Sequence, residues 1–230
     1  MSAAFFEVMK IDVLRFNFCK YRWYLLRRRL RIIGEHTSSV GANAIEYNLD
    51  AFAQAGAVFG MAKRMSLLLY PVAALLRGRP EANVLIVGPR TEDDIIWAKS
   101  LGLRNTRGLD LFTYSKWIDL GDIHNTQMES ASLDAVLLGW MISYSKDPTQ
   151  VIAECKRLLR PGGYLGIGIE TNPAQKAEGI RPPRVNHINS SGDLVDLVKE
   201  RVVFIHDPEL NVPYECAVIF RICAMPGLAY

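Results

Sequence analysis

Residues 84–92 have the sequence Val-Leu-Ile-Val-Gly-Pro-Arg-Thr-Glu. Four apolar residues, three of them β-branched, that end at a glycine are typical of a strand buried on both faces of a parallel sheet. Residues 91–100 then predict a helix, because three acids stand in its first turn, where the helix dipole favours negative charge. A buried strand followed at once by a helix predicts an α/β unit in which backbone amides near Gly88 face a ligand.

The same alternation of strand and helix continues toward the C-terminus. We expect further strands at 108–112, 117–120, 134–140, 164–170, 201–206 and 215–222. Asp147 followed by Pro148 predicts a helix start, and Pro161-Gly162-Gly163 ends this helix. Ser190 or Ser191 begins a second helix that extends to about Glu200. This order indicates an α/β fold with a mainly parallel sheet.

Residues 1–79 differ from the rest of the chain, because they are basic, aromatic and compatible with helices. The turn at 78–80 (Gly-Arg-Pro) separates them from an α/β domain at 80–230. Residues 1–40 carry eight basic and three acidic residues, a net charge of +5, whereas the whole chain carries +3. The remainder is therefore net −2, and a partner attracted by charge meets the N-terminal extension first.

Composition excludes several classes of protein. Half of the residues are hydrophobic and 22% are charged, which supports a packed core and argues against disorder. The four cysteines and four histidines lack the spacing of a disulfide framework or a metal site, so we expect no metal. The uncharged runs at 51–62 and 65–76 are too short to span a bilayer, and no signal peptide is evident. We expect a cytoplasmic protein.

Five elements, in this order, resemble the class I S-adenosylmethionine-dependent methyltransferases. They are Val84–Gly88, Leu109-Asp110, Gly121-Asp122, the Ser-Leu-Asp-Ala-Val sequence at 132–136, and Arg-Leu-Leu-Arg-Pro-Gly-Gly-Tyr at 157–164. The resemblance covers about residues 82–222. It implies a Rossmann-like sheet of seven strands or fewer, with helices on both faces and a closing antiparallel strand. It also implies S-adenosylmethionine as cofactor, with methyl transfer to a small molecule or to a saccharide- or lipid-linked acceptor.

The resemblance also implies which residues form the site. Asp110 follows Gly88 by 22 positions, a spacing like that of the ribose-binding acid in nucleotide-binding sheets. By resemblance, Asp110 binds the ribose and Asp122 approaches the adenine amino group. Three further residues join them: Ile123 against the adenine ring, and Gly139 and Trp140 at the methionine end and the substrate mouth.

Two departures from the family pattern leave an alternative open. The glycine loop of the family is commonly Gly-x-Gly-x-Gly, whereas here it is Gly-Pro-Arg-Thr-Glu. Arg90 either binds the cofactor carboxylate or blocks the pocket, and Glu92 adds a second side chain where backbone usually lies close to the cofactor. The alternative is an inactive binding or scaffold protein that has lost the cofactor. The link from Asp110 to Trp117 is also too short for a crossover helix, which predicts a more open adenine side.

The acceptor side of the site is less defined by the sequence. Tyr144 and His187 are the candidates for a catalytic base, only because their loops belong to the ligand-binding edge of the sheet. The arginine-rich segment at 27–31 predicts either contact with a membrane surface or phosphorylated substrate, or a helical lid with solvated arginines. Nucleic acid is disfavoured because the body of the chain is not basic. A nicotinamide-dependent oxidoreductase is disfavoured because Gly-x-Gly-x-x-Gly is absent.

Overall fold

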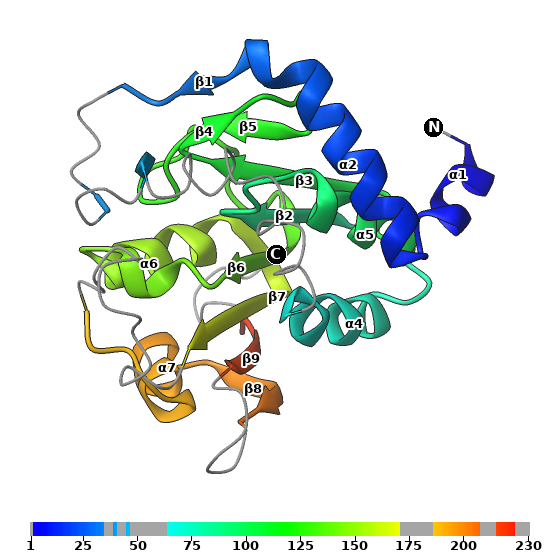
Figure 1. Cartoon of the computed structure of the whole chain (residues 1–230). Coiled ribbons are helices and arrows are strands. Elements are labelled where there is room, and N and C mark those ends of the chain that lie inside the picture. The colour runs from blue at the N-terminus through cyan, green and yellow to red at the C-terminus, as the bar shows by residue number, and fades with distance from the viewer. Residues whose placement is uncertain are drawn as a thin grey trace.

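The main sheet has seven strands in a computed structural model that describes residues 2–34, 39–40, 45–46, 64–170, 186–207 and 215–223 (Figure 1). In spatial order they are β5 (Ile118–Leu120), β3 (Asn105–Asp110), β2 (Asn83–Val87), β6 (Leu133–Gly139), β7 (Leu159–Glu170), β9 (Glu215–Arg221) and β8 (Arg201–His206). The first five are parallel, and β9 runs antiparallel to both of its neighbours. The expected Rossmann-like sheet with a closing antiparallel strand is confirmed.

Helices cover both faces of this sheet. Val84 and Ile86 of β2 pack with α4 (Ser66–Leu75) and α5 (Asp93–Ser100). Leu85 and Val87, which alternate with them, pack on the opposite face with α6 (Pro148–Leu158) and α7 (Ser191–Val198). Because successive side chains of a strand point to opposite faces, an unbroken apolar strand requires a helix layer on each side.

The helix starts follow the capping residues that the sequence predicts. Asp147 accepts a hydrogen bond from the Gln150 amide at 2.9 Å and caps α6. At α7, Ser190 forms a capping box with Asp193. Two boundaries were wrong. β3 spans Asn105–Asp110 and not 108–112, and β7 begins at Leu159 and not at Tyr164, so Pro-Gly-Gly lies inside the strand. At this point the pairing of β7 with β6 shifts register, as in a β-bulge, and Gly162 takes a left-handed φ of +79°.

The first 34 residues form a separate layer, which we call the N-terminal arm (residues 2–34). It contains α1 (Ala3–Val8), α2 (Asp12–Leu26), η1 (Arg27–Arg29) and β1 (Arg31–Ile32). In Figure 1, α2 lies along the outside of α5, and β1 pairs antiparallel with β4 (Phe112–Thr113). The arm therefore packs against the half of the sheet that begins with β5 and β3.

The arm occupies the place of the missing crossover helix. As expected, residues 111–117 between β3 and β5 contain no helix. The expectation of a more open side was wrong, however, because Trp23, Leu26 and Leu30 of the arm pack against Phe112 and Tyr114. An apolar surface exposed by a short connection needs a cover, and here residues from the other end of the chain provide it.

Two arginines of α2 are buried where the arm contacts α5. Arg15 is fully buried and donates from Nε to Asp93 Oδ1 at 2.8 Å. Arg22 makes a two-pronged ion pair with the fully buried Glu92, in which Nη2 lies 2.7 Å from Oε1. The prediction of solvated arginines concerned the segment at 27–31 and did not include these two. Arg27, Arg28 and Arg29 are exposed.

Candidate functional site

The candidate site lies at the edge of the sheet where the parallel strands end. β2 is at the centre, with β3 on one side and β6 on the other, so the order of the strands reverses at β2. Ligands of open α/β sheets bind beyond the carboxyl ends of the strands at such a reversal. Gly88, Asp110 and Gly139 stand at the carboxyl ends of these three strands.

The turn after β2 contacts the acid at the end of β3. Gly88 has φ +71°, a left-handed conformation that glycine adopts without strain. Arg90 is also left-handed, at φ +55°, and its amide donates to Asp110 Oδ2 at 3.0 Å. The predicted convergence of the glycine turn and Asp110 is therefore present in the structure.

Asp110 is a buried carboxylate held by backbone amides. Its side chain is 8% exposed, and Oδ1 accepts from the Leu111 amide at 2.8 Å. Burial raises the pKa of Asp110 to about 6, although hydrogen bonds from the backbone of Arg90, Leu111 and Phe112 oppose this rise. At pH 7 the group is ionised and acts only as a hydrogen-bond acceptor.

Glu92 does not compete for this edge. Its carboxylate is directed toward the arm, where it accepts from Arg22 and from the Ser115 hydroxyl. Of the two side chains that the sequence placed against the cofactor, only Arg90 remains near Asp110. The positive charge of Arg90 lowers the pKa values of both Asp110 and Asp94.

Asp122 follows β5 and is held in a network of polar side chains. Oδ1 accepts from the His124 amide at 3.0 Å and lies 2.6 Å from His124 Nδ1, while Oδ2 accepts from the Ser39 hydroxyl. His124 Nε2 in turn lies 2.7 Å from the buried Ser145 Oγ. Burial by itself would raise the pKa of Asp122, but the hydrogen bonds from His124 and Ser39 outweigh it and lower the pKa. A carboxylate offers about four acceptor positions, so one remains for a ligand.

The other sequence-predicted residues lie deeper than expected. Ile123 is 2% exposed and belongs to the apolar cluster beneath α6. Gly139 lies against Met65, since a Cβ there would come within 3.1 Å of the Met65 sulfur. These contacts are with the chain's own core.

Trp140 is 6% exposed and packs flat against a glycine of β7. A Cβ on Gly168 would lie 2.7 Å from the indole ring, so only glycine leaves room for it. Trp140 itself has φ +57°. The Arg64 guanidinium also contacts the indole and lies 4.9 Å from the ring centroid. The indole Nε1 is buried and has no hydrogen-bond partner among the described residues.

The two candidates for a catalytic base lie on segments that are joined to each other. Tyr144 ends the short helix η3 (Ile142–Tyr144), which follows β6, and it is partly exposed. His187 is exposed on the segment before α7. Asn186 connects the segments, because its side-chain amide donates to the Ile142 and Ser145 carbonyls at 2.8 and 2.9 Å.

Three residues that the sequence analysis missed also belong to this edge. Asp94, in the first turn of α5, has a buried Oδ1 without a hydrogen-bond partner in the described chain, and burial raises its pKa. Arg64 binds Glu170 at the end of β7, 3.0 Å away, and Ser39 reaches Asp122. The run of three acids at 92–94 could have revealed Asp94, whereas no local pattern distinguishes Arg64 or Ser39.

Two features are absent from the described residues. None of the helices there combines the length and the apolar character needed to cross a membrane. Within the same ranges, no three side chains of His, Cys, Asp or Glu are grouped as a metal site requires.

Comparison with known proteins identifies one sequence family. Residues 100–167 match a methyltransferase domain family. A Streptomyces fradiae protein, described only as an uncharacterized 37.1 kDa protein in transposon TN4556, is 41% identical over 51 residues. That match spans 22% of this chain and 15% of the relative, so it says little about the rest of either protein.

Solved structures extend the likeness to most of the described chain. A methyltransferase of Thermotoga maritima, titled a possible histamine N-methyltransferase, has a TM-score of 0.51 and 20% identity over 78% of this chain and 98% of its own. The methyltransferase CalH, solved with S-adenosylhomocysteine, has a TM-score of 0.58 and 14% identity over 79% and 64%. The [4+2]-cyclase SpnF has a TM-score of 0.55 and 13% identity over 84% and 99%. At these identities the likeness shows the fold alone.

The matched family and the fold imply S-adenosylmethionine as the cofactor. The residues at the edge suit such a zwitterionic nucleoside, because Asp94 Oδ1 and Trp140 Nε1 are buried polar atoms without partners in the described chain. Asp110, ionised at neutral pH, adds an acceptor beside the glycine turn. Residues 100–167 therefore match a methyltransferase domain model, and the described chain has the fold of solved S-adenosylmethionine-dependent methyltransferases.

Proposed function

We propose that this protein is an S-adenosylmethionine-dependent methyltransferase that acts on a small molecule or on a saccharide- or lipid-linked acceptor. The observation that carries the proposal is the hydrogen bond from the Arg90 amide to Asp110 at 3.0 Å. It fixes the glycine turn against the acid at the point where the strand order reverses. The charge balance supports a small acceptor, because the chain beyond residue 40 is slightly acidic and repels nucleic acid.

Each polar group at the edge has a role in this proposal. Asp110 accepts hydrogen bonds from the ribose hydroxyls, and Asp122 uses its remaining acceptor position for the adenine amino group. Arg90 attracts the cofactor carboxylate, and Asp94 attracts the cofactor amino group. The buried, unpartnered Oδ1 of Asp94 supports its role, since a cationic partner would satisfy it and lower its raised pKa.

The cofactor supplies an electrophilic methyl group on a positively charged sulfur. The chain's own task is to hold an acceptor in line with that group and to keep water away. Tyr144 and His187 remain the candidates to take a proton from the acceptor, and Asn186 holds their two segments together. Tyr144→Phe should leave the affinity for the cofactor unchanged, because we assign this side chain to the acceptor.

Calorimetric titration with S-adenosylmethionine and S-adenosylhomocysteine tests the proposal. Asp110→Asn replaces an acceptor oxygen with a donor, and we expect the affinity to fall roughly 10- to 100-fold, the cost of about 1.5–3 kcal/mol for a charged hydrogen bond. Asp119→Asn is the matched control, because Asp119 lies on the neighbouring strand β5 in an exposed pair with Arg107. If the folded natural chain binds neither ligand, the methyltransferase proposal fails.

The alternative of an inactive scaffold has its own test. Arg90→Gly restores a glycine where the family pattern commonly has one, and the φ of +55° suits glycine. Cofactor binding by Arg90→Gly that is absent from the natural chain would favour the scaffold. Glu92 is unsuitable for this test because its carboxylate supports the arm through Arg22.

We also propose that the outer face of α2 contacts an anionic membrane surface. Tyr21, Tyr24 and Leu25 are 61%, 64% and 55% exposed on this helix, and the exposed arginines at 27–29 follow directly. Exposed apolar side chains beside basic ones suit the interface of anionic lipids. Arg15 and Arg22, on the inner face of α2, form ion pairs with Asp93 and Glu92. The outer face of α2 therefore remains available for contact with a membrane.

Co-sedimentation with phosphatidylcholine vesicles, with and without phosphatidylserine, tests this contact. We expect binding only to the anionic vesicles, and Tyr21→Ser combined with Tyr24→Ser should weaken it. Ile205→Ser, at a residue 49% exposed on β8, is the control for loss of an exposed apolar side chain elsewhere. Equal binding by the double variant and the natural chain would contradict the contact.

A further inference from the structure

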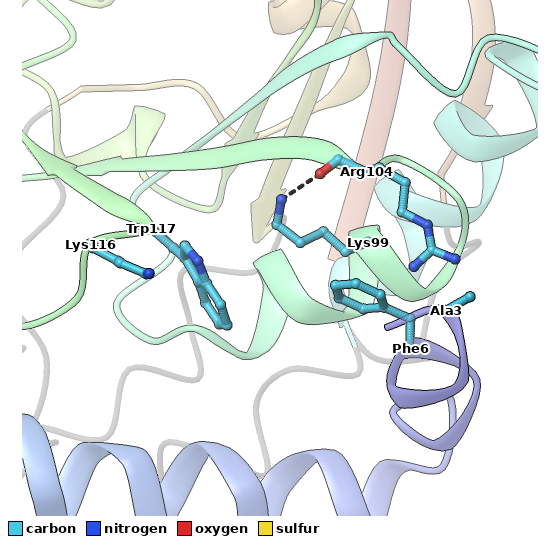
Figure 2. A pocket seen from close by; sticks show the side chains of 6 residues that line it. All are labelled: Ala3, Phe6, Lys99, Arg104, Lys116 and Trp117. Carbon is cyan, nitrogen blue, oxygen red and sulfur yellow. Dashed lines mark hydrogen bonds between the residues drawn. The ribbon is translucent and has the colours of Figure 1, made fainter. Parts of the chain in front are cut away.

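A pocket lies away from the cofactor edge, where α1 meets the end of α5. We call it the arm pocket, and it has a volume of about 500 Å³. Figure 2 shows the residues that line it: Ala3, Phe6, Lys99, Arg104, Lys116 and Trp117. The candidate cofactor site is at the first turn of α5 and the arm pocket is at its last, and an eight-residue helix is roughly 12 Å long. The two sites are therefore separate.

Three cations from three parts of the chain line the arm pocket, and Figure 2 shows Lys99 between Arg104 and Lys116, which lie at its opposite ends. Lys99 belongs to α5, Arg104 to the turn before β3, and Lys116 to the segment before β5 (Figure 2). None of the ion pairs found among the described residues includes any of these three side chains. Like charges gathered around a cavity without acids favour an anion inside it.

Arg104 contains a buried donor that lacks an acceptor. Its guanidinium lies 4.4 Å from the centroid of Phe6, and Nη1 is buried without a hydrogen-bond partner in the described parts of the chain. A buried unpaired donor is costly, so the Arg104 side chain gains from any small shift that gives Nη1 an acceptor.

Lys99, the second cation of the pocket, also has no acidic partner among the described ion pairs. Its amino group donates to the Arg104 carbonyl at 2.5 Å, as Figure 2 shows. Burial, together with the charges of Arg107 and Arg104, lowers the pKa of Lys99 to about 8. Asp119 is already paired with Arg107, so it does not neutralise the cations that line the pocket. A bound anion would restore the ordinary pKa of Lys99.

The size and walls of the cavity indicate the rest of the ligand. Phe6 and Trp117 give it aromatic surface as well as charge, and the volume exceeds what a single phosphate group fills. Phosphate oxygens suit guanidinium and ammonium donors, and a planar or sugar group suits aromatic walls. We propose that the arm pocket binds a phosphorylated small molecule of the nucleoside diphosphate class, independently of the methyltransferase site.

Such a ligand would also fasten the arm to the α/β body. Ala3 and Phe6 come from α1, whereas the three cations come from α5 and the segments around β3 and β5. A ligand that binds both sides of the pocket stabilises the folded arm by mass action. Binding should therefore raise the melting temperature as well as release heat.

Titration of the full chain with uridine diphosphate tests the proposal without adenine, which could enter the cofactor site. We expect uridine diphosphate to bind more tightly than pyrophosphate, and uridine not to bind. Arg104→Gln and Lys116→Gln should each weaken uridine diphosphate by about tenfold or more, because each removes one cation from the pocket. Lys20→Gln is the matched control, since Lys20 is an exposed lysine of the arm outside the pocket.

The outcomes separate this proposal from the methyltransferase proposal. Titration of the same variants with S-adenosylmethionine should give unchanged affinity, whereas Asp110→Asn should leave uridine diphosphate binding unchanged. Absence of binding by the folded natural chain at millimolar uridine diphosphate would overturn the proposal. Equal weakening by Lys20→Gln would also overturn it, because attraction to any basic surface would then explain the binding.

Discussion

α6 and α2 both pack beside the sheet, but different forces hold them there. α6 presents an apolar face, in which Val151, Cys155 and Leu158 are fully buried against the sheet. α2 is held at α5 by buried ion pairs, of which Arg15 with Asp93 is the deepest. Apolar contact tolerates small changes in fit, whereas a buried ion pair is severely weakened when one partner is lost. The N-terminal arm is therefore attached by buried ion pairs in addition to its apolar contacts, whereas α6 is held by its apolar face.

The largest effect should follow from breaking the deepest ion pair. Arg15→Ala leaves Asp93 buried without its partner, and we expect the free energy of unfolding to fall by about 3–5 kcal/mol. Urea denaturation measures it. Lys20→Ala, at an exposed position of the same helix, should cost less than about 0.5 kcal/mol. A loss below about 1 kcal/mol for Arg15→Ala would show that the pair does not hold the arm.

Replacing both partners sharpens this test. Arg15→Met combined with Asp93→Leu removes both charges and keeps apolar side chains of similar size. It should recover most of the stability that Arg15→Ala loses, because the cost lies in the unpaired charge. A double variant as unstable as Arg15→Ala would instead indicate that packing of the arginine on Phe16 and Trp97 is the main contribution.

The matching change in α6 removes apolar volume and leaves no charge behind. Leu158→Ala should lower the free energy of unfolding by about 3 kcal/mol, through lost burial and the cavity that remains. Leu158→Met, which nearly conserves volume, should cost less than about 1.5 kcal/mol. Denaturation curves of both variants measure the difference. If the two cost the same, packing at this position does not hold α6.

The same contrast explains what could be predicted from the sequence. The strands, the cap of α6 at Asp147 and the capped start of α7 follow from residues a few positions apart, and all are present. The docking of α2 depends on Arg15 and Arg22 meeting acids 78 and 70 positions away, which no local pattern encodes. The left-handed backbone at Arg90 and Trp140 is equally unpredictable, because neither residue is a glycine.

In the candidate site, too, some features could be predicted from the sequence and others could not. Gly88 and Asp110 could be paired from their spacing, since parallel strands of similar length bring their carboxyl ends together. The burial of Trp140 depends on Gly168 of β7, and the hydrogen bonds of Asp122 depend on Ser39. Such contacts exist only once the strands are assembled, so the sequence could suggest the edge of the sheet but not how deep each side chain lies.

Acid pH should change the stability contributed by an acid beside α2 and by an acid on α6 in opposite directions. Burial raises the pKa of Asp93, beside α2, from 3.8 to about 6 against the effect of Arg15. Between these values the folded chain holds a proton that the unfolded chain has lost, so stability falls by about 2–3 kcal/mol as pH rises through this window. Hydrogen bonds from Arg157 lower the pKa of Glu154, on α6, from 4.5 to about 2. Its contribution is complete above pH 4.5 and is lost as pH falls toward 2.

The slope of stability against pH separates these two groups. Asp93→Asn should make the fall between pH 4 and pH 6 shallower without removing it, because burial also raises the pKa values of Asp110 and Asp94. Glu154→Gln should leave the slope between pH 5 and pH 6 unchanged and remove the loss of stability at lower pH. Unfolding free energies at several pH values measure both slopes. An unchanged slope in Asp93→Asn would mean that this acid does not titrate as proposed.

The smallest effects concern the first turns of the two helices. Asp147→Ala removes the cap of α6 and should cost about 1 kcal/mol. α2 begins after Ile11, which is 56% exposed and makes no capping hydrogen bond, so Ile11→Asp should add stability of about 0.5–1 kcal/mol. Thermal unfolding of both variants gives these values. A gain at position 11 would show that the arm is held by its ion pairs despite a poor helix start, whereas a loss would mean that the exposed isoleucine contributes contacts of its own.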